Sequence, residues 1–246
     1  MRKFGLIGLP LIQSFSKKYF TAKFERENID ARYDLYELQE ISAFEPLKKT
    51  DGLCGLNVTI PYKQQVMQYL DELDETAAEI GAVNVIKFIR ENDSLRLRGY
   101  NSDAIGFESS IKPLLKSNHK KALILGTGGA SKAVDYILKK NGLETTFVSR
   151  TPKVNNFTYS QLNKELILNN LVIVNASPVG TFPNVDNCPD IPYEFITNQH
   201  LLYDVVYNPA ETLFLKKGKD RGAAILNGEE MLIGQAIAAW NIWNEK

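Results

Sequence analysis

The sequence predicts an α/β protein of two domains, one with a mixed β-sheet and one with a parallel β-sheet. Short apolar runs alternate with amphipathic helical patterns along almost the whole chain, as is typical of α/β proteins. One of these runs leads through a glycine-rich turn directly into a helix, which favours a parallel sheet. Two other strand-like segments flank an Asn-Asp turn, which favours an antiparallel hairpin and therefore a mixed sheet.

The predicted strands are short and end at polar or turn-forming residues. They cover residues 4–8, 31–36, 55–60, 83–89, 122–125, 145–149, 172–175, 202–205 and 223–226. The hairpin spans residues 89–98, with Asn92 and Asp93 at its turn. Helices are expected over residues 103–115, 131–140 and 231–243, because apolar side chains recur there at helical spacing. A polar break at residues 117–121 precedes a buried strand, so the second domain is expected to start near Asp103.

Composition excludes several classes of partner. The 246 residues are 44% hydrophobic, and Lys plus Arg and Asp plus Glu each total 29, so the net charge is zero. No excess of either sign favours nucleic acid or anionic lipid as a partner. No uncharged apolar run reaches the roughly 20 residues that span a bilayer, and Gly8 and Pro10 interrupt any signal-peptide core. With two distant cysteines, Cys54 and Cys188, the chain is expected in the cytoplasm.

The glycine-rich turn is the strongest chemical signal. A predicted strand ends at Leu125, Gly126 and Gly128 allow a tight turn, and a helix follows. Such a turn lets the backbone approach a pyrophosphate, whose charge is then met by free N–H groups at the start of the helix. Ser131 stands where the common pattern has glycine or alanine. This context favours a bound dinucleotide over a glycine turn without a ligand.

Arg150 follows the next predicted strand and indicates which dinucleotide binds. An NAD site usually has an acidic side chain here that binds the ribose 2′-hydroxyl, whereas an arginine can bind a 2′-phosphate through two hydrogen bonds. The sequence therefore predicts NADP as the cofactor. The alternative is a solvated arginine at a strand end.

Polar clusters at the ends of other predicted strands are suited to lining a site for a polyhydroxylated ligand. They are Ser14-Phe15-Ser16 and residues 57–63, 81–84 and 101–103. Each alone could be a turn or a helix cap. With the glycine-rich turn 126–131, the segment 204–209 and the segment 227–236, they occur in the order of the motifs of shikimate dehydrogenases. The chain resembles that family over essentially its whole length.

The resemblance implies the reversible reduction of 3-dehydroshikimate to shikimate with NADPH, in the pathway to aromatic amino acids. It implies a substrate domain of residues 1–103, to which the C-terminal helix 228–246 returns. Residues 104–227 would form a Rossmann domain that binds NADP. The enzyme would be a monomer or a homodimer.

The resemblance also implies which residues form the site. Ser14 and Ser16 would hold the substrate carboxylate. The ring hydroxyls would be surrounded by Thr59, Lys63, Asn84, Asn101, Asp103 and Gln235, with Tyr207 beside them. The cofactor residues would be Gly126, Thr127, Gly128, Gly129, Ala130, Ser131, Ser149, Arg150, Thr151, Val205, Gly228 and Met231.

Three motifs depart from the usual form of the family. Lys17 follows Ser16 where proline is usual. The family's Asn-Arg-Thr is replaced by residues 149–151, Ser-Arg-Thr, and its Asn-Thr-Asp-Gly by residues 101–104, Asn-Ser-Asp-Ala. Arg150 and Asp103 are retained.

Lys63 and Asp103 are the candidate catalytic pair. Reduction of a ketone by hydride requires a proton donor at the carbonyl oxygen. A lysine ammonium can donate that proton, and a nearby carboxylate favours the protonated form. In the oxidation direction, Lys63, Asp103 or a water could take the proton. His119 and His200 lie in polar segments outside the clusters, so no catalytic role is expected for them, and no spacing indicates a metal.

Three alternatives remain open at this stage. A quinate/shikimate dehydrogenase, or a relative acting on another hydroxy acid, would share nearly all of these motifs. A folate-linked dehydrogenase of similar two-domain design would not account for Ser14, Ser16 and the cluster 101–103. A non-catalytic NADP-binding regulator would not require Lys63 and Asp103.

Overall fold

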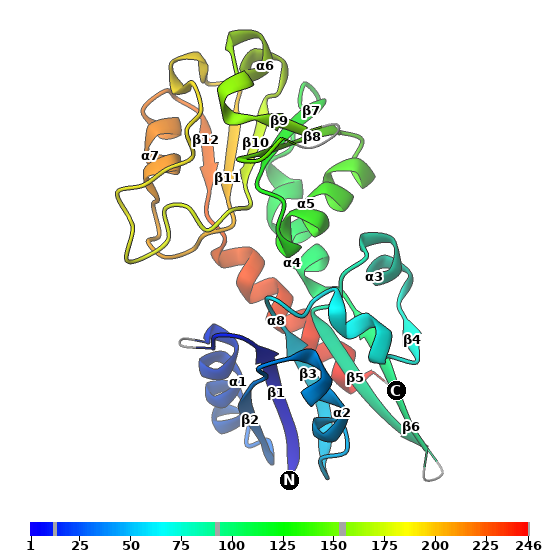
Figure 1. Cartoon of the computed structure of the whole chain (residues 1–246). Coiled ribbons are helices and arrows are strands. Elements are labelled where there is room, and N and C mark those ends of the chain that lie inside the picture. The colour runs from blue at the N-terminus through cyan, green and yellow to red at the C-terminus, as the bar shows by residue number, and fades with distance from the viewer. Residues whose placement is uncertain (12–13, 92–93, 153–155, 246) are drawn as a thin grey trace. The chain divides into compact units, whose positions relative to one another are not determined.

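The structure is a computed structural model that describes residues 1–11, 14–91, 94–152 and 156–245 (Figure 1). Backbone contacts divide the chain into two compact units. Unit 1 contains Met1–Ser102 and Gln235–Lys246, and unit 2 contains Asp103–Gly234. Each unit has its own six-stranded sheet. The predicted α/β class is therefore confirmed.

Unit 1 is built on a mixed sheet with the strand order β2-β1-β3-β5-β6-β4. The strands are β1 (Arg2–Gly8), β2 (Ala31–Glu37), β3 (Leu53–Val58), β4 (Glu72–Leu73), β5 (Val85–Glu91) and β6 (Ser94–Tyr100). Strands β1, β2 and β3 are parallel, whereas β5 is antiparallel to both β3 and β6. Strands β5 and β6 are the arms of the predicted hairpin, and its turn residues Asn92 and Asp93 lie outside the described residues.

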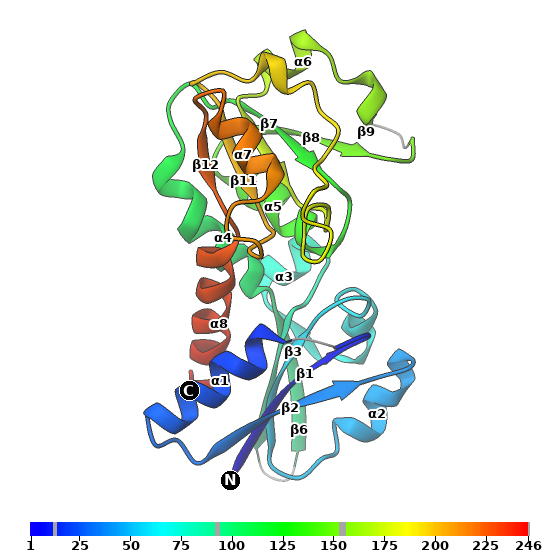
Figure 2. The ribbon, with the colours of Figure 1, turned by 90° about the vertical axis from the view of Figure 1, so that its left-hand side faces the viewer.

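Helices cover both faces of the first sheet. They are α1 (Phe15–Arg26), α2 (Phe44–Leu47), α3 (Glu75–Ile80) and the C-terminal α8 (Glu229–Asn244), with short 3₁₀ turns at Ile41–Ala43 and Gln65–Tyr69. Figure 2 shows α1 and α8 on one side of this sheet and α2 on the other. One core accordingly joins β1 to α1 and α8, and a second core packs β3 and β5 against α2 and α3.

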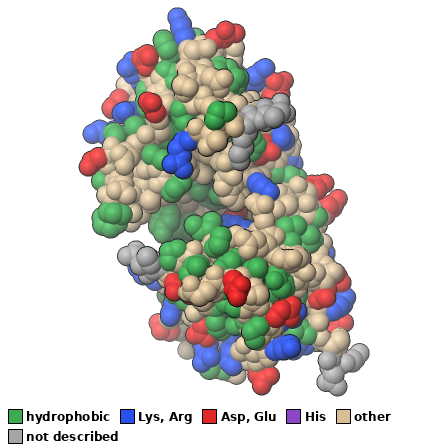
Figure 3. All heavy atoms as spheres, in the orientation of Figure 1, with side chains coloured by type: hydrophobic (Ala, Val, Ile, Leu, Met, Phe, Trp, Pro, Cys, Tyr) green, Lys and Arg blue, Asp and Glu red, His purple; other side chains and the backbone are tan. Residues whose placement is uncertain are grey.

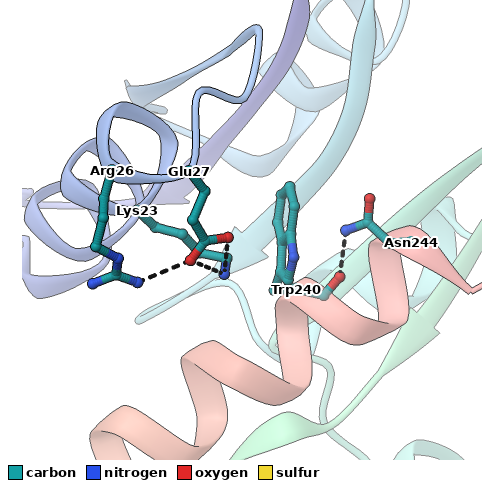
Figure 4. A network of polar contacts seen from close by, with 5 residues as sticks. All are labelled: Lys23, Arg26, Glu27, Trp240 and Asn244. Carbon is teal, nitrogen blue, oxygen red and sulfur yellow. Dashed lines mark hydrogen bonds and ion pairs between the residues drawn. The ribbon is translucent and has the colours of Figure 1, made fainter.

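Aromatic rings hold α8 against β1 and α1. The ring of Phe4 lies 4.8 Å from that of Trp243 and 5.6 Å from that of Trp240, measured between centroids. The Lys23 ammonium lies 5.4 Å from the centre of the Trp240 ring and donates to Glu27 (Figure 4). An exposed ion pair of this kind contributes only about 0.2–1 kcal/mol, so the buried rings carry most of the packing energy.

Unit 2 is built on a parallel sheet with the strand order β12-β11-β10-β7-β8-β9. The strands are β7 (Lys121–Leu125), β8 (Glu144–Ser149), β9 (Asn156–Thr158), β10 (Val172–Asn175), β11 (Leu201–Asp204) and β12 (Ala224–Leu226). This is the Rossmann order, in which successive strands extend the sheet in one direction from β7 to β9 and in the opposite direction from β10 to β12. The strand order therefore reverses between β7 and β10. Ligands bind at the carboxyl ends of the strands on either side of such a reversal.

Helices on both faces of the second sheet complete unit 2. They are α4 (Ser102–Ile111), α5 (Gly129–Lys140), α6 (Lys164–Asn169) and α7 (Leu213–Lys219), with 3₁₀ turns at Lys112–Leu114, Tyr159–Gln161 and Tyr193–Phe195. Figure 1 shows α5 and α7 on opposite sides of this sheet. The helix expected over residues 103–115 ends at Ile111, because Pro113 has no N–H to continue the α-helical ladder.

The two histidines are buried, although their segments read as polar linkers. His119 is 4% exposed and accepts a hydrogen bond from Lys116 N, and His200 is 1% exposed and accepts one from Thr197 N. Burial lowers the pKa of both imidazoles. Both rings therefore stabilise loops of unit 2.

Two surface properties bear on partners. On the face drawn in Figure 3, basic and acidic side chains are interspersed over both units. This distribution matches the zero net charge. Within the described ranges, no helix is long and apolar enough to cross a membrane.

Candidate functional site

Several predicted substrate residues of unit 1 lie at one edge of its sheet. Strands β1, β3 and β6 run in one direction and β5 runs in the other, so three carboxyl ends and one amino end meet at this edge. Thr59 follows β3, Asn84 precedes β5 and Asn101 follows β6. Backbone bonds from Thr59 N to Ile7 O (2.9 Å) and from Asn84 N to Tyr100 O (3.0 Å) hold these ends in register.

The two asparagine side chains at this edge are buried and fixed. Asn84 is 3% exposed, and its Oδ1 accepts from Ser102 N (2.6 Å) while its Nδ2 donates to Ser102 Oγ (3.0 Å). Asn101 is also 3% exposed and donates from Nδ2 to Ala82 O (2.9 Å). Amides held in this way have a defined orientation, as specific recognition of hydroxyl groups requires.

Ser14 and Ser16 lie at the start of α1. Ser14 is the N-cap, and its Oγ accepts from Lys17 N (3.1 Å). Because this bond uses only a lone pair of the hydroxyl, the Ser14 proton remains available to an anion. The partial positive charge at a helix N-terminus also favours a carboxylate here. The usual proline in place of Lys17 could not donate this bond, so the departure from the family pattern has a structural consequence.

Two further buried side chains complete this edge. Asn57 belongs to the predicted polar cluster 57–63, whereas Tyr33 was not predicted as a site residue. Tyr33 is 3% exposed and reaches from β2 across β1, donating from its hydroxyl to Asn57 Oδ1 (2.7 Å). Burial raises the pKa of Tyr33, and a hydrogen bond with the Ser16 side chain partly offsets the increase. Asn57 Nδ2 in turn donates to Asn84 O (3.4 Å). Hydrogen bonds thus connect Tyr33 to Asn84 through the buried side chain of Asn57.

The remaining predicted substrate residues come from other elements. Lys63 is partly buried in the segment after β3, and its carbonyl accepts from Val83 N (2.7 Å). Gln235, in α8, is 7% exposed. In unit 2, Asp103 lies in the first turn of α4 and is 8% exposed, whereas Tyr207 follows β11 and is 44% exposed.

Unit 2 contains a cavity of about 690 Å³ at the carboxyl ends of β7, β8 and β10. Five predicted cofactor residues line it, namely Gly126, Thr127, Gly128, Ser149 and Arg150. Its other lining residues were not predicted, and they are Thr158, Tyr159, Ser160, Ala176, Ser177, Pro178, Val179, Cys188, Pro189 and Asp190. The volume is within the range of about 300–1,000 Å³ that is usual for ligand pockets.

The turn that borders this cavity fits a pyrophosphate. Gly126 has a φ of +113°, a backbone conformation that residues with a side chain rarely adopt. Its N–H donates to Val148 O (2.8 Å). Gly128 is the N-cap of α5 and has no side chain to cap the first N–H groups of that helix. Gly129 and Ala130 begin the helix, and the buried Ser131 donates from Oγ to Gly128 O (2.6 Å). An anion can therefore approach several backbone donors.

Arg150 lies where a 2′-phosphate is expected. It is exposed directly after β8. Burial raises the pKa of Tyr159, and the positive charge of Arg150 lowers it, so the guanidinium acts on this wall of the cavity. Thr158 pairs with Ser149 through β9, which brings the hydroxyls of Thr158 and Ser160 to the same wall. Sequence reasoning missed this wall because β9 has only three residues.

Seven predicted cofactor residues are absent from the described lining of this cavity. Gly129, Ala130 and Ser131 are in the first turn of α5, and the other four lie elsewhere. Thr151 is exposed just beyond Arg150. Val205 lies after β11 and donates from its N–H to Asn175 O (2.9 Å). Gly228 packs so closely that a Cβ there would overlap the Val205 carbonyl. Met231 is buried in the first turns of α8. Val205 and Gly228 thus lie side by side after β11 and before α8.

Comparison with known proteins assigns the chain to a family. Residues 6–86 match the family described as the shikimate dehydrogenase substrate binding domain. A shikimate dehydrogenase (NADP(+)) of Clostridium beijerinckii is 37% identical over an alignment of 260 residues that covers 100% of this chain and 93% of that protein. This chain belongs to the shikimate dehydrogenase family. The predicted resemblance is therefore confirmed.

Solved structures agree with this family assignment. A shikimate 5-dehydrogenase of Thermus thermophilus, in complex with NADP(H) and shikimate, is 28% identical with a TM-score of 0.85, covering 99% of this chain and 94% of that chain. A quinate dehydrogenase of Corynebacterium glutamicum, in complex with NAD, is 25% identical with a TM-score of 0.87, covering 99% and 93%. Within the described ranges, no group of three or more His, Cys, Asp and Glu side chains could hold a metal ion.

Proposed function

We propose that this chain is an NADP-dependent shikimate dehydrogenase, which reduces 3-dehydroshikimate reversibly to shikimate in aromatic amino acid biosynthesis. The observation that carries the proposal is the edge of the first sheet, where Thr59, Asn84 and Asn101 gather beside the start of α1. Hydroxyl and amide groups, with a helix N-terminus, are suited to a ligand that has several hydroxyls and one carboxylate. Unit 1, with α8, is the substrate domain in this proposal.

NADP would be held by unit 2. The backbone N–H groups at Gly126–Ser131 would bind the pyrophosphate. Arg150, together with its neighbours Ser149 and Thr151, would bind the 2′-phosphate. Val205, Gly228 and Met231 would complete the cofactor site. When bound, NADPH supplies the hydride.

The substrate would be held by side chains that are already fixed. Ser14 and Ser16 would bind the carboxylate at the positive end of α1. Asn84 and Asn101, whose amides are bonded within unit 1, would bind ring hydroxyls together with Thr59. Gln235 and Tyr207 would also contact the ring. Groups fixed before binding lose little entropy when the substrate arrives.

Lys63 would be the principal catalytic residue, and Asp103 would orient it and a substrate hydroxyl. As hydride reaches the ketone carbon, negative charge develops on the oxygen, and the Lys63 ammonium can donate a proton to it. In the oxidation direction, the hydroxyl of shikimate must lose that proton to a base near the same atom.

A cytoplasmic monomer or homodimer belongs to the same proposal. The supporting observation is that Cys54 and Cys188 are both free thiols, as is usual in a reducing compartment. Gel filtration with light scattering would distinguish the monomer from the homodimer.

Absorbance at the band of the reduced nicotinamide tests the function directly. Shikimate and quinate would each be tested with NADP⁺ and with NAD⁺. The proposal expects efficient turnover of shikimate with NADP⁺. Faster turnover of quinate would favour the quinate/shikimate alternative, for which the likeness to a quinate dehydrogenase is the specific observation. Cofactor binding without turnover of either acid would favour a non-catalytic regulator.

A further inference from the structure

Two buried polar side chains in unit 2 have no part in the function proposed above. Asn175 and Asp204 are the last residues of β10 and β11 and are partners in the register of these parallel strands. Both are 0% exposed. A buried carboxylate is costly unless hydrogen bonds compensate for the lost water, so its presence calls for a specific explanation.

Asp204 accepts hydrogen bonds from three different segments. Its Oδ1 accepts from Asn175 Nδ2 (2.9 Å) and from Val206 N (3.0 Å). Its Oδ2 accepts from Thr212 Oγ1 (2.6 Å), at the start of α7. Burial raises the pKa of Asp204 to about 7, and these three bonds each lower it. The carboxyl group therefore connects β10, the segment after β11 and α7.

Asn175 extends these connections to the wall of the cofactor cavity. Its Nδ2 also donates to Val179 O (3.2 Å), and its Oδ1 accepts from Ser177 N (3.1 Å) and Ser177 Oγ (2.6 Å). Ser177 and Val179 line the cavity. Both amide hydrogens and the amide oxygen of Asn175 are thus bonded, so its side chain can adopt only one orientation. Asp204 contributes to that orientation, because its Oδ1, like Val179 O, accepts from the NH₂ group.

We propose that Asp204 is a positioning residue for cofactor binding, which acts through Asn175 on the cavity wall at residues 176–179. Through Val206 N–H it also fixes the segment that carries Val205. The inference rests on the proposed NADP site of unit 2. A residue that served the core alone would be better apolar, since the paired strands bury it completely.

The test compares Asp204→Asn with Asp204→Leu. Asparagine can keep every bond, because its oxygen can accept from Asn175 and Val206 while its NH₂ donates to Thr212, whose hydroxyl can also accept. Leucine has a similar volume but leaves Asn175 Nδ2, Val206 N and Thr212 without their acceptor. The Kd for NADP⁺ would be measured by titration, and the KM values for NADP⁺ and shikimate by steady-state kinetics.

Asp204→Leu is expected to raise the Kd and the KM for NADP⁺ by at least about tenfold, because it removes a buried hydrogen-bond acceptor. The same variant should change the shikimate KM by less than about threefold. Asp204→Asn is expected to restore both NADP⁺ constants to within about threefold of wild type. Ser110→Ala is the matched control, because Ser110 is a buried polar residue of unit 2 that bonds Tyr203 outside this network. It should leave the NADP⁺ constants unchanged.

A folded Asp204→Leu protein with an NADP⁺ Kd within about threefold of wild type would overturn the proposal. So would equal increases in the KM values for NADP⁺ and shikimate. Should Asp204→Leu fail to fold, Asn175→Ala removes the connection to Ser177 and must produce the same selective loss of NADP⁺ affinity, and an unchanged affinity would overturn the proposal. Wild-type turnover of shikimate reports on the proposed function, whereas the ratio of mutant to wild-type Kd reports on Asp204.

Discussion

Replacing Arg150 with aspartate should reverse the cofactor preference of unit 2. Arg150 is exposed, and an ordinary exposed ion pair would contribute only about 0.2–1 kcal/mol. Arg150 nevertheless lines the cavity together with the partly buried Tyr159, and its positive charge lowers the pKa of Tyr159. Two charge-assisted bonds to a phosphate contribute roughly 1.5–3 kcal/mol, or about 10- to 150-fold in affinity.

Cofactor titration of wild type, Arg150→Asp and Arg221→Asp measures this effect. Arg221→Asp makes the same charge change in unit 2 on an exposed residue outside the cavity lining, so it controls for net charge. Arg150→Asp should weaken NADP⁺ by about 10- to 150-fold and spare NAD⁺, since aspartate can accept from the 2′-hydroxyl. The wild-type preference should also fall as salt is raised. Equal losses of NADP⁺ and NAD⁺ affinity in Arg150→Asp would refute the reasoning.

Three further predictions concern binding and stability. The double variant Ser14→Ala/Ser16→Ala should raise the shikimate KM at least about tenfold in steady-state kinetics and leave the NADP⁺ Kd unchanged. An unchanged shikimate KM would show that the two serines do not bind the substrate carboxylate. Tyr33→Phe leaves buried Asn57 Oδ1 without its donor and should cost about 1–3 kcal/mol in urea unfolding, whereas an unchanged midpoint would show that this bond contributes nothing. Burial raises the pKa of Asp204 to about 7 from an ordinary 3.8, so the folded state favours the protonated carboxyl group. The contribution of this group to the free energy of unfolding is complete below about pH 4 and is lost as pH rises through 7. Urea midpoints at a series of pH values should show this decline in wild type and a smaller one in Asp204→Asn, and parallel profiles would contradict the assignment.

The sequence predicted the parts of the fold that depend on local pattern. The strand, glycine turn and helix around Gly126 could be predicted because each has a distinct local signal. Strands β4 and β9 have two and three residues and were missed, because so few positions show no alternation. Consequently the cavity wall at Thr158–Ser160, which β9 positions beside Ser149, was not predicted.

Contacts that depend on strand register could not be predicted from one sequence. Tyr33 and Asn57 are separated by β1 in the sheet, and nothing in either local segment indicates that they share a hydrogen bond. The pairing of Asn175 with Asp204 likewise follows from the register of β10 and β11. Asn57 could be noticed only as part of the polar cluster 57–63, and Asn175 only as the polar residue at the end of an apolar run. That signal is shared with ordinary turn and cap residues.

The turnover number of Lys63→Ala tests the central claim most directly. General acid catalysis supplies about 10²- to 10⁴-fold, so kcat for 3-dehydroshikimate and NADPH should fall by a comparable factor while the KM values change little. Lys63→Arg should also be slow, because a guanidinium keeps the charge but does not release its protons. Circular dichroism and the NADP⁺ Kd would establish that each variant is folded. A folded Lys63→Ala enzyme with a kcat within about threefold of wild type would contradict the account.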